Sequence, residues 1–234
     1  MSDMIESPSP NHNERPAGKA IDMLLIHYTG MRDGDAALQR LSDPAAKVSS
    51  HYLIEEDGRI HRLVDESRRA WHAGVGYWAG ERDINAVSIG IELVNPGHDN
   101  GYRAFPQPQI AALIELGKAI LARHPIPAWR VLGHSDIAPT RKIDPGELFD
   151  WKALAEAGIG LWPEPASGPT DLASIQRALQ RYGYEVAPSG TLDAATTAAL
   201  QAFQRHFRPA LIDGQPDEET VELLLGLQIK IEQK

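Results

Sequence analysis

Three short, nearly continuous apolar runs constrain the fold of this chain most, because each ends beside a residue that can bind a metal or move a proton. Residues 20–27 end in His27, residues 86–93 carry Glu92 near their end, and residues 129–133 lead to His134. Runs of this kind are typical of strands buried on both faces of a sheet. Loops that follow strand ends commonly carry functional side chains. The pattern therefore predicts a buried sheet with imidazole and carboxylate groups at its strand ends.

Helices are predicted between the apolar runs. Residues 35–42 fit a short helix, and residues 109–123 carry apolar side chains along one helical face before two prolines. An Asp-Gly pair at residues 57–58 lies between two further apolar segments, which is typical of a β-hairpin. Strands with interspersed helices indicate an α/β fold in which helices flank a mixed central β-sheet.

The last third of the chain is organised differently. Residues 158–169 are dense in Pro and Gly and fit a linker or docking segment. Beyond them, residues 190–200 are echoed by residues 214–224, and each copy places an Asp where it can cap a following helix. With a further helix expected over residues 172–182, the repeat predicts a small three-helix C-terminal domain.

The composition divides the chain into four segments. Residues 1–18 are rich in Ser, Pro, Asn and charge, so we expect a flexible N-terminal tail in which His12 is solvated. An α/β domain, a linker and the three-helix domain follow, with expected boundaries at residues 19–160, 161–170 and 171–234.

Composition and charge also restrict the functions to be considered. The net charge of −9 and the pI of about 5.5 argue against a nucleic-acid partner, because surfaces that bind phosphate are usually basic. The chain has no Cys, so a metal site would have to use His, Asp and Glu. We expect neither a secretory signal peptide nor a transmembrane segment in this sequence, because it shows no basic stretch with an apolar core at its start and no long apolar run.

His27 and His134 are the main candidates for a metal site. A Pro-containing loop after His134 returns Lys142 and Asp144 toward the same strand end. Two imidazoles and one carboxylate, from His27, His134 and Asp144, suit zinc and would leave a fourth coordination position for water. Because these residues lie far apart in sequence, their meeting is a hypothesis about the fold. The alternative is that both histidines are ordinary core or surface residues.

Two further residues suit the chemistry of such a site. Glu92, at a strand end, is the candidate general base that would take the water proton and return it to a leaving amine. Lys142 would supply positive charge where an oxyanion develops. Without the metal hypothesis, a surface Glu and a solvated Lys are the simpler interpretations.

The other histidines compete for these roles on composition alone. His51 at a strand start and His61 within a strand are weaker ligand candidates. His72 follows Trp71 in a predicted loop, which favours contact with a substrate. Three histidines lack a supporting pattern and are expected to face solvent, namely His98, His124 and His206.

Five ordered blocks of sequence carry a resemblance to a known family. They are residues 25–29, 48–58, 69–74 and 88–93, and residues 133–139 together with 142–146. The blocks resemble the zinc-dependent N-acetylmuramoyl-L-alanine amidases of the type 2 family, which includes anhydro-muramyl peptide amidases and is related to peptidoglycan recognition proteins. The resemblance spans most of the first 160 residues, and it implies the same mixed sheet flanked by helices.

The resemblance assigns roles residue by residue. It places the zinc ligands on His27, His134 and Asp144, with one Zn²⁺ per chain. It places the catalytic Glu on Glu92 and the family's Lys on Lys142. None of these positions departs from the family pattern.

The resemblance also suggests contacts with substrate. The Trp-His-Ala-Gly block is similar to the wall of the family's substrate groove, so Trp71 and His72 are expected to contact substrate, and Tyr28 and His51 are assigned to the same group. Residues 171 to about 230 resemble a three-helix peptidoglycan-binding domain. This domain would either bind glycan or peptide, or serve only a structural role.

The functional hypothesis is hydrolysis of the amide between the lactyl group of muramic acid and L-alanine, with peptidoglycan or a muropeptide as the partner. One alternative is a recognition protein of the same fold that binds muropeptide without cleaving it, and another is a zinc enzyme that cleaves a different cell-wall amide. Intact peptidoglycan and soluble anhydro-muropeptide both remain open as substrates. The compartment stays open with them, as the cell envelope or periplasm, or the cytoplasm.

Overall fold

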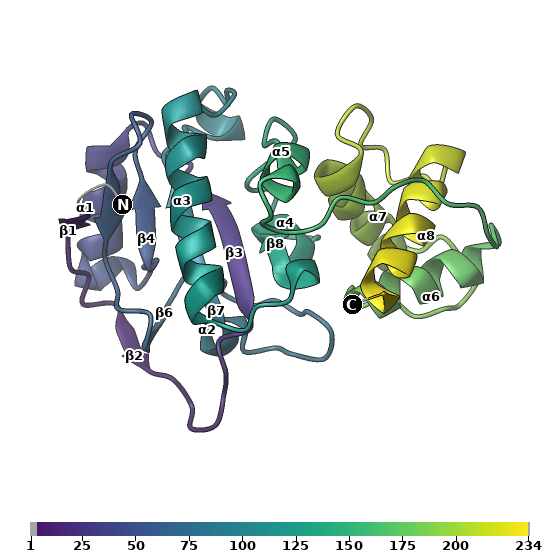
Figure 1. Ribbon diagram of the computed structural model, residues 1–234, viewed down its shortest axis with the longest axis horizontal. Coiled ribbons are helices and arrows are strands. Elements are labelled where there is room, and N and C mark those ends of the chain that lie inside the picture. Colours follow the sequence, from purple (N-terminus) through teal and green to yellow (C-terminus); the bar gives the residue numbers. More distant parts are fainter. Residues whose placement is uncertain (1–3, 234) are drawn as a thin grey trace. The chain divides into compact units, whose positions relative to one another are not determined.

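The computed structural model describes residues 4–233 (Figure 1), and the chain divides into two compact units. One unit comprises Met1–Gly74 and Asp83–Leu132, and the other comprises Val75–Arg82 and Gly133–Lys234. None of the helices within residues 4–233 is long and apolar enough to cross a membrane.

A mixed β-sheet organises the first unit, as the sequence predicts. Its order, within the described residues, is β1 (Ile5–Glu6), β5 (Ile60–Arg62), β4 (Tyr52–Ile54), β7 (Ser88–Leu93), β3 (Met23–Tyr28) and β8 (Val131–Gly133). The pairs β1 with β5, β4 with β7, and β3 with β7 are parallel, whereas β4 and β5 form the predicted antiparallel hairpin.

The central strands are buried on both faces. Residues 23–26 of β3 have no exposed surface, in keeping with their unbroken apolar run. The register places His27 opposite Glu92, and Glu92 opposite Leu53 of β4. Because paired residues on neighbouring strands point to the same face, the sheet itself puts His27 and Glu92 side by side.

Helices cover this sheet. α1 (Gly34–Ser42) begins at Asp33, whose carboxylate accepts from Ala36 N at 2.8 Å, and its apolar residues pack in a cluster that includes Leu53. α3 (Gln107–Arg123) packs over β4 (Figure 1), and the buried amide of Gln109 donates to Ile54 O at the end of β4 and to Val94 O just after β7. The remaining short elements of this unit are α2 (Ile84–Val87), η1 (Pro44–Ala46), η2 (His98–Asn100) and η3 (Ala128–Arg130).

Two local predictions need correction. The apolar run predicted as a strand from residue 86 begins instead as α2, and the strand starts at Ser88. A short apolar run has no period that separates one helical turn from a strand. The segment predicted to be irregular over residues 66–84 contains β6 (Arg68–Ala70).

Residues 4–18 do not form the flexible tail that their composition suggests, and residues 1–3 of that prediction lie outside the described residues. Residues 5–6 form β1, and β2 (His12–Glu14) pairs with β6 in a separate two-stranded sheet. Asn11 is almost fully buried and donates to Asp43 O and Val48 O, both at 2.8 Å. The polar side chains of this segment satisfy buried backbone groups, so their polarity does not indicate solvation. His12 is half-buried and accepts from Arg68.

The second unit is helical. It contains α4 (His134–Ile137), α5 (Trp151–Glu156), α6 (Leu172–Tyr182), α7 (Ala194–Phe207) and α8 (Glu218–Glu232). The last three are the predicted C-terminal helices, and we call residues 171–233 the helical module. Its preceding segment packs along α8, where Ala166 N donates to Glu222 O at 3.0 Å and Lys230 Nζ donates to Trp162 O at 2.7 Å.

A pair of buried glutamines explains the internal repeat. Gln176 Oε1 accepts from Gly190 N at 2.8 Å, and Gln204 Oε1 accepts from Gly214 N at the same distance. The side-chain NH₂ of each Gln reaches a Thr hydroxyl of the next helix. Each repeat is therefore a loop held to the preceding helix, and the predicted Asp cap follows in both copies.

Candidate metal centre

His27 is the last fully buried residue of β3, and its ring belongs to a chain of hydrogen bonds inside the first unit. His27 Nε2 lies 3.0 Å from His72 Nδ1, and His72 Nε2 lies 3.2 Å from Ser88 Oγ. Ser88 Oγ donates to Ile84 O at 2.6 Å, so its lone pairs face His72.

For two neutral rings, these contacts assign the protons. Since Ser88 donates elsewhere, a neutral His72 donates from Nε2 and accepts at Nδ1 from His27 Nε2. A neutral His27 then carries its lone pair on Nδ1. A metal-binding histidine commonly donates its other ring N–H to a fixed acceptor, which is the arrangement seen here. His72 therefore orients His27. Its side chain is only 9% exposed, and its predicted contact with substrate stays a prediction.

His51 lies behind His72, with their ring centroids 5.6 Å apart. Its Nδ1 accepts from Gly90 N at 3.0 Å, and its Nε2 lies 3.1 Å from Arg68 O. Burial and the nearby Arg15 charge lower the pKa of His51 to about 3, so the ring is neutral. The prediction that His51 contacts substrate is wrong for this structure, because the side chain is 0% exposed and both ring nitrogens face protein groups.

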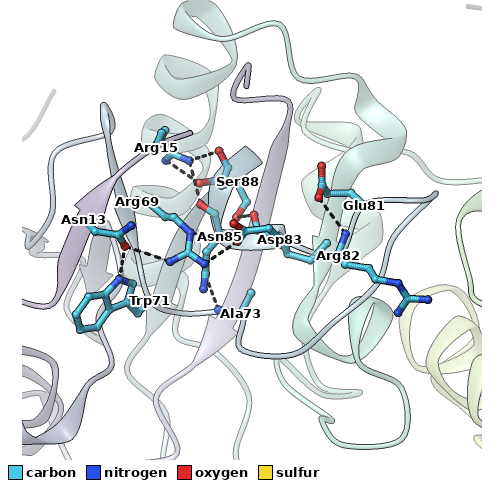
Figure 2. A network of polar contacts seen from close by, with 12 residues as sticks. Asn13, Arg15, Arg69, Trp71, Ala73, Glu81, Arg82, Asp83, Asn85 and Ser88 are labelled. Carbon is cyan, nitrogen blue, oxygen red and sulfur yellow. Dashed lines mark hydrogen bonds and ion pairs between the residues drawn. The ribbon is translucent and has the colours of Figure 1, made fainter. Parts of the chain in front are cut away.

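Arg15, from the segment expected to be a flexible tail, lies beside this histidine group, and Figure 2 shows its guanidinium next to Ser88. Its guanidinium donates to the carbonyls of Glu66, Asn85, Ala86 and Ser88 at 2.9–3.0 Å, and Nη2 lies 3.0 Å from His51 Nε2. Burial lowers the pKa of Arg15 to about 10, which still leaves it charged at neutral pH. A half-buried cation with this many acceptors fixes the backbone next to His72.

The loop that carries Trp71 and His72 is fixed in the same network. Trp71 Nε1 donates to Asn13 Oδ1 at 2.7 Å, and Asn85 Oδ1 accepts from the backbone of His72 and Ala73 (Figure 2). A Cβ on Gly90 would lie 2.5 Å from His72 Cγ, so only glycine leaves room for this ring. Trp71 is half-buried, and its predicted contact with substrate stays a prediction.

His134 opens α4 in the second unit and lies against Asp144. Its Nδ1 is 3.0 Å from Asp144 Oδ2, and Ser135 N donates to Asp144 O at 2.9 Å, so side chain and backbone both join the two segments. Arg141 donates to Val75 O at 2.6 Å and lies 3.4 Å from His134 Nε2. A cavity of about 480 Å³ borders this turn and is lined in part by Arg141 and Ala138.

The structure brings together the three residues proposed as metal ligands. His27, His134 and Asp144 are all buried, and each offers a ligand atom within 4.8 Å of the other two. Ligands of a tetrahedral zinc ion with bonds of about 2.0–2.2 Å lie roughly 3.3–3.6 Å apart, close to the 3.0 Å between His134 Nδ1 and Asp144 Oδ2. The donor set and its spacing therefore fit a divalent metal such as zinc.

The other predicted residues neighbour the proposed ligands in the sheet or along the chain. Glu92 is half-buried on β7, opposite His27, and Lys142 is half-buried in the turn two residues before Asp144. Tyr28 follows His27 directly, and its hydroxyl lies 3.0 Å from His98 Nδ1.

Sequence reasoning missed an aromatic group beside Tyr28. His98 stacks on Tyr102 with ring centroids 4.2 Å apart, and Tyr102 also lies beside Tyr28 and Phe105. The buried Asn95 holds this loop, because it donates to Arg103 O and accepts from Gly97 N. His98 is exposed, as predicted, but its stacked ring had no signal in the sequence beyond a His and a Tyr in a Gly-rich loop.

Two histidines predicted to face solvent are buried or bonded. His206 is 3% exposed and its Nδ1 lies 2.8 Å from Asp136 Oδ2. His124 Nε2 lies 2.7 Å from Glu66 Oε2, and bonds from Arg123 and this His outweigh the effect of burial and lower the pKa of Glu66 to about 2. Both partners are distant in sequence, so no local pattern reveals them. His61, a weaker ligand candidate, is buried and lies 2.9 Å from Ser7 Oγ.

Two family comparisons match this chain. Residues 17–147 match the N-acetylmuramoyl-L-alanine amidase family, and residues 169–224 match a peptidoglycan binding domain family. The second match covers the helices of the helical module up to the first half of α8.

Individual relatives agree with the family matches. The N-acetylmuramoyl-L-alanine amidase AmiD of Escherichia coli is 43% identical over 223 residues, covering 86% of this chain and 79% of that protein. The 1,6-anhydro-N-acetylmuramyl-L-alanine amidase AmpD of the same organism is 37% identical over 161 residues, covering 62% of this chain and 86% of that protein. A structure of AmiD from E. coli with the substrate anhydro-N-acetylmuramic acid-L-Ala-D-γ-Glu-L-Lys matches with a TM-score of 0.82 and 40% identity, covering 95% of this chain and 94% of AmiD.

Proposed function

This chain belongs to the N-acetylmuramoyl-L-alanine amidase family, and we propose that it hydrolyses the amide between the lactyl group of N-acetylmuramic acid, or its anhydro form, and L-alanine of the stem peptide. The observation that carries the mechanism is the cluster of His27, His134 and Asp144. The substrate in the AmiD structure has this bond, which supports a muropeptide as the substrate here.

The cluster would hold one Zn²⁺ per chain. Bound zinc would lower the pKa of a water molecule to near neutrality and would polarise a carbonyl group. A neutral His27 that donates from Nε2 to His72 would offer the lone pair of its other ring nitrogen to the metal. Every ligand imidazole must offer the metal a lone pair, so metal affinity should fall in acid.

Glu92 is the proposed general base. It would take a proton from the attacking water as the new C–O bond forms and would deliver a proton to the amine of L-alanine as the C–N bond breaks. Its place opposite His27 on a rigid central strand supports this role. Lys142 would stabilise the negative charge that develops on the carbonyl oxygen. The products are a lactyl carboxylate and a free peptide amine.

Aromatic side chains would hold the substrate. Tyr28 lies one residue from His27, and the stacked pair of His98 and Tyr102 is held beside it by a hydrogen-bonded loop. A fixed aromatic surface offers large contact area at low entropic cost. Trp71 keeps its proposed role as a further contact. The helical module would bind peptidoglycan, as its family match suggests.

Product analysis tests this proposal. The protein is incubated with an anhydro-muropeptide and zinc, and free peptide is followed by mass spectrometry. We expect peptide release by the native protein and by Glu156→Ala, which removes an exposed carboxylate of α5, and a loss of at least about 100-fold in Glu92→Ala. Binding without release would indicate a recognition protein. Release of a different fragment would indicate another amide, and full activity of Glu92→Ala would remove Glu92 from the mechanism.

A further inference from the structure

A buried carboxylate two residues after His134 joins the metal-binding turn to the helical module. Asp136 Oδ2 accepts from Gly133 N at 2.8 Å, which closes the single turn of α4. The same carboxylate meets two donors from the helical module: Tyr184 Oη donates to Oδ1 and His206 Nδ1 donates to Oδ2, each at 2.8 Å. Asp136 and Tyr184 are 1% exposed and His206 is 3% exposed.

Burial makes these contacts energetically significant. A carboxylate removed from water is stable only when its oxygens accept hydrogen bonds, and all three donors here are fixed by protein. Burial raises the pKa of Tyr184 well above its usual value, so the phenol keeps its proton and remains a donor. Without the module donors, only the Gly133 N–H of these three would still bond Asp136.

Aromatic packing holds both donors in place. The His206 ring stacks on Trp151 with centroids 3.8 Å apart and on Phe207 with centroids 4.0 Å apart. Tyr184 packs edge to face with Trp78 at 5.0 Å. Trp151 also closes on the start of the metal-binding turn, because a Cβ on Gly133 would lie 3.2 Å from its ring. The donors therefore have little freedom to move with the carboxylate.

The internal repeat shows that His206 is a departure from a pattern. The Gln-Arg pair at residues 176–177 corresponds to the pair at residues 204–205, and the buried Gln of each pair holds its loop in the same way. The next residue is the buried Ala178 in the first copy and His206 in the second. The repeat itself therefore needs no imidazole at this position, and the only hydrogen bond recorded for the His206 side chain within residues 4–233 goes to Asp136.

We propose that the helical module positions the metal ligand His134, with Tyr184 and His206 acting through Asp136 on the turn that carries it. Because Ser135 N also bonds Asp144 O, the same turn places both His134 and Asp144. Tyr184 and His206 are positioning residues that touch neither metal nor substrate. The inference rests on the proposed function only in taking His134 and Asp144 as metal ligands.

Metal affinity of the full-length protein tests this role without any use of activity. Zn²⁺ affinity is measured by competition with a chromophoric chelator, and the visible absorption of bound Co²⁺ reports the ligand geometry. We expect Tyr184→Phe and His206→Phe each to weaken Zn²⁺ binding by about tenfold and to alter the Co²⁺ spectrum. Losing a residue that supports a metal ligand commonly weakens metal binding by about 10- to 100-fold, and we expect the smaller loss because Gly133 N still bonds Asp136. His206→Asn keeps a donor near the Nδ1 position and should restore both readouts.

A control separates positioning from stability. Gln176→Ala removes loop bonds within the module without touching Asp136, so it should lower the free energy of unfolding and leave metal affinity unchanged. Unchanged affinity and Co²⁺ spectra in both Phe variants would overturn the inference and leave the metal site intact. Absence of metal binding by the native protein would instead contradict the proposed function.

Discussion

The two histidines of the metal cluster are supported in different ways. His27 ends a central strand, and its ring donates to His72, which is bonded within the first 88 residues of the chain. His134 begins a one-turn helix whose closing carboxylate is held by Tyr184 and His206, 50 and 72 residues later in the chain. The first support is local to a sheet, whereas the second depends on a separate module.

The charge of the two supports differs as well. Burial and the Arg15 charge together keep the His51 ring neutral in the first unit, while the buried Asp136 faces His206 in the second. From this comparison we expect substitutions in the hydrogen-bond network around His27 to affect stability and metal binding together. Substitutions within the helical module should affect metal binding only where they remove a hydrogen bond to Asp136.

The largest expected effect on stability comes from Arg15. Arg15→Met would keep the apolar stem but leave the carbonyls of Asn85, Ala86 and Ser88 without their charged donor, at a cost of about 3 kcal/mol in the free energy of unfolding. Urea denaturation measures this cost, and chelator competition should show weaker Zn²⁺ binding, because the backbone under His72 shifts.

Arg208→Met is the matched control in the other unit. Arg208 is 4% exposed and donates to Thr220 and Asp217 inside the helical module. Its loss should also destabilise the protein, yet Zn²⁺ affinity should stay within about twofold of the native value, since Asp136 keeps its donors. If Arg208→Met weakened metal binding as much as Arg15→Met, the contrast between a local and a remote support would fail.

A smaller effect is expected from His72, whose role is to accept the His27 proton. His72→Phe removes this acceptor and should weaken Zn²⁺ binding by about 30-fold, or roughly 2 kcal/mol. His72→Asn offers an oxygen near the Nδ1 position and should recover most of the affinity. Isothermal titration with Zn²⁺ measures both. Equal losses in the two variants would mean that His72 fills space and does not orient His27.

Much of this organisation could be predicted from sequence, and the exceptions have physical causes. The apolar run before His27 has no polar interruption, so its burial in a sheet was readable. The Asp caps of the repeat are local and were equally clear. By contrast, Asn11 and Arg15 lie in a polar stretch, and their partners are backbone carbonyls, which carry no sequence signal.

The candidate site divides in the same way. Strand ends and family blocks pointed to His27, His134 and Asp144, which the structure brings together. The groups behind them were assigned less well, because His51 and His206 depend on contacts at long sequence distance. Hydrophobic periodicity reports which face of an element is buried, and it cannot report which buried polar groups meet.

The smallest predicted effect is a pH dependence that belongs to the first unit. His51 has its pKa lowered from 6.5 to about 3 by burial and by Arg15, so the unfolded chain binds a proton at His51 well before the folded chain does as pH falls. The stability that His51 contributes is present above pH 6.5 and is lost progressively toward pH 3. The free energy of unfolding should fall by about 1.5 kcal/mol between pH 6.5 and 5 through this group alone. Urea unfolding at several pH values should therefore show a shallower acid loss in His51→Asn than in the native protein, although the variant is less stable throughout. Other titrating groups contribute equally to both proteins. If the free energy of unfolding fell with the same slope against pH in both, His51 would take up its proton as readily in the folded as in the unfolded chain. A neutral His51 would then no longer distinguish the first unit from the second.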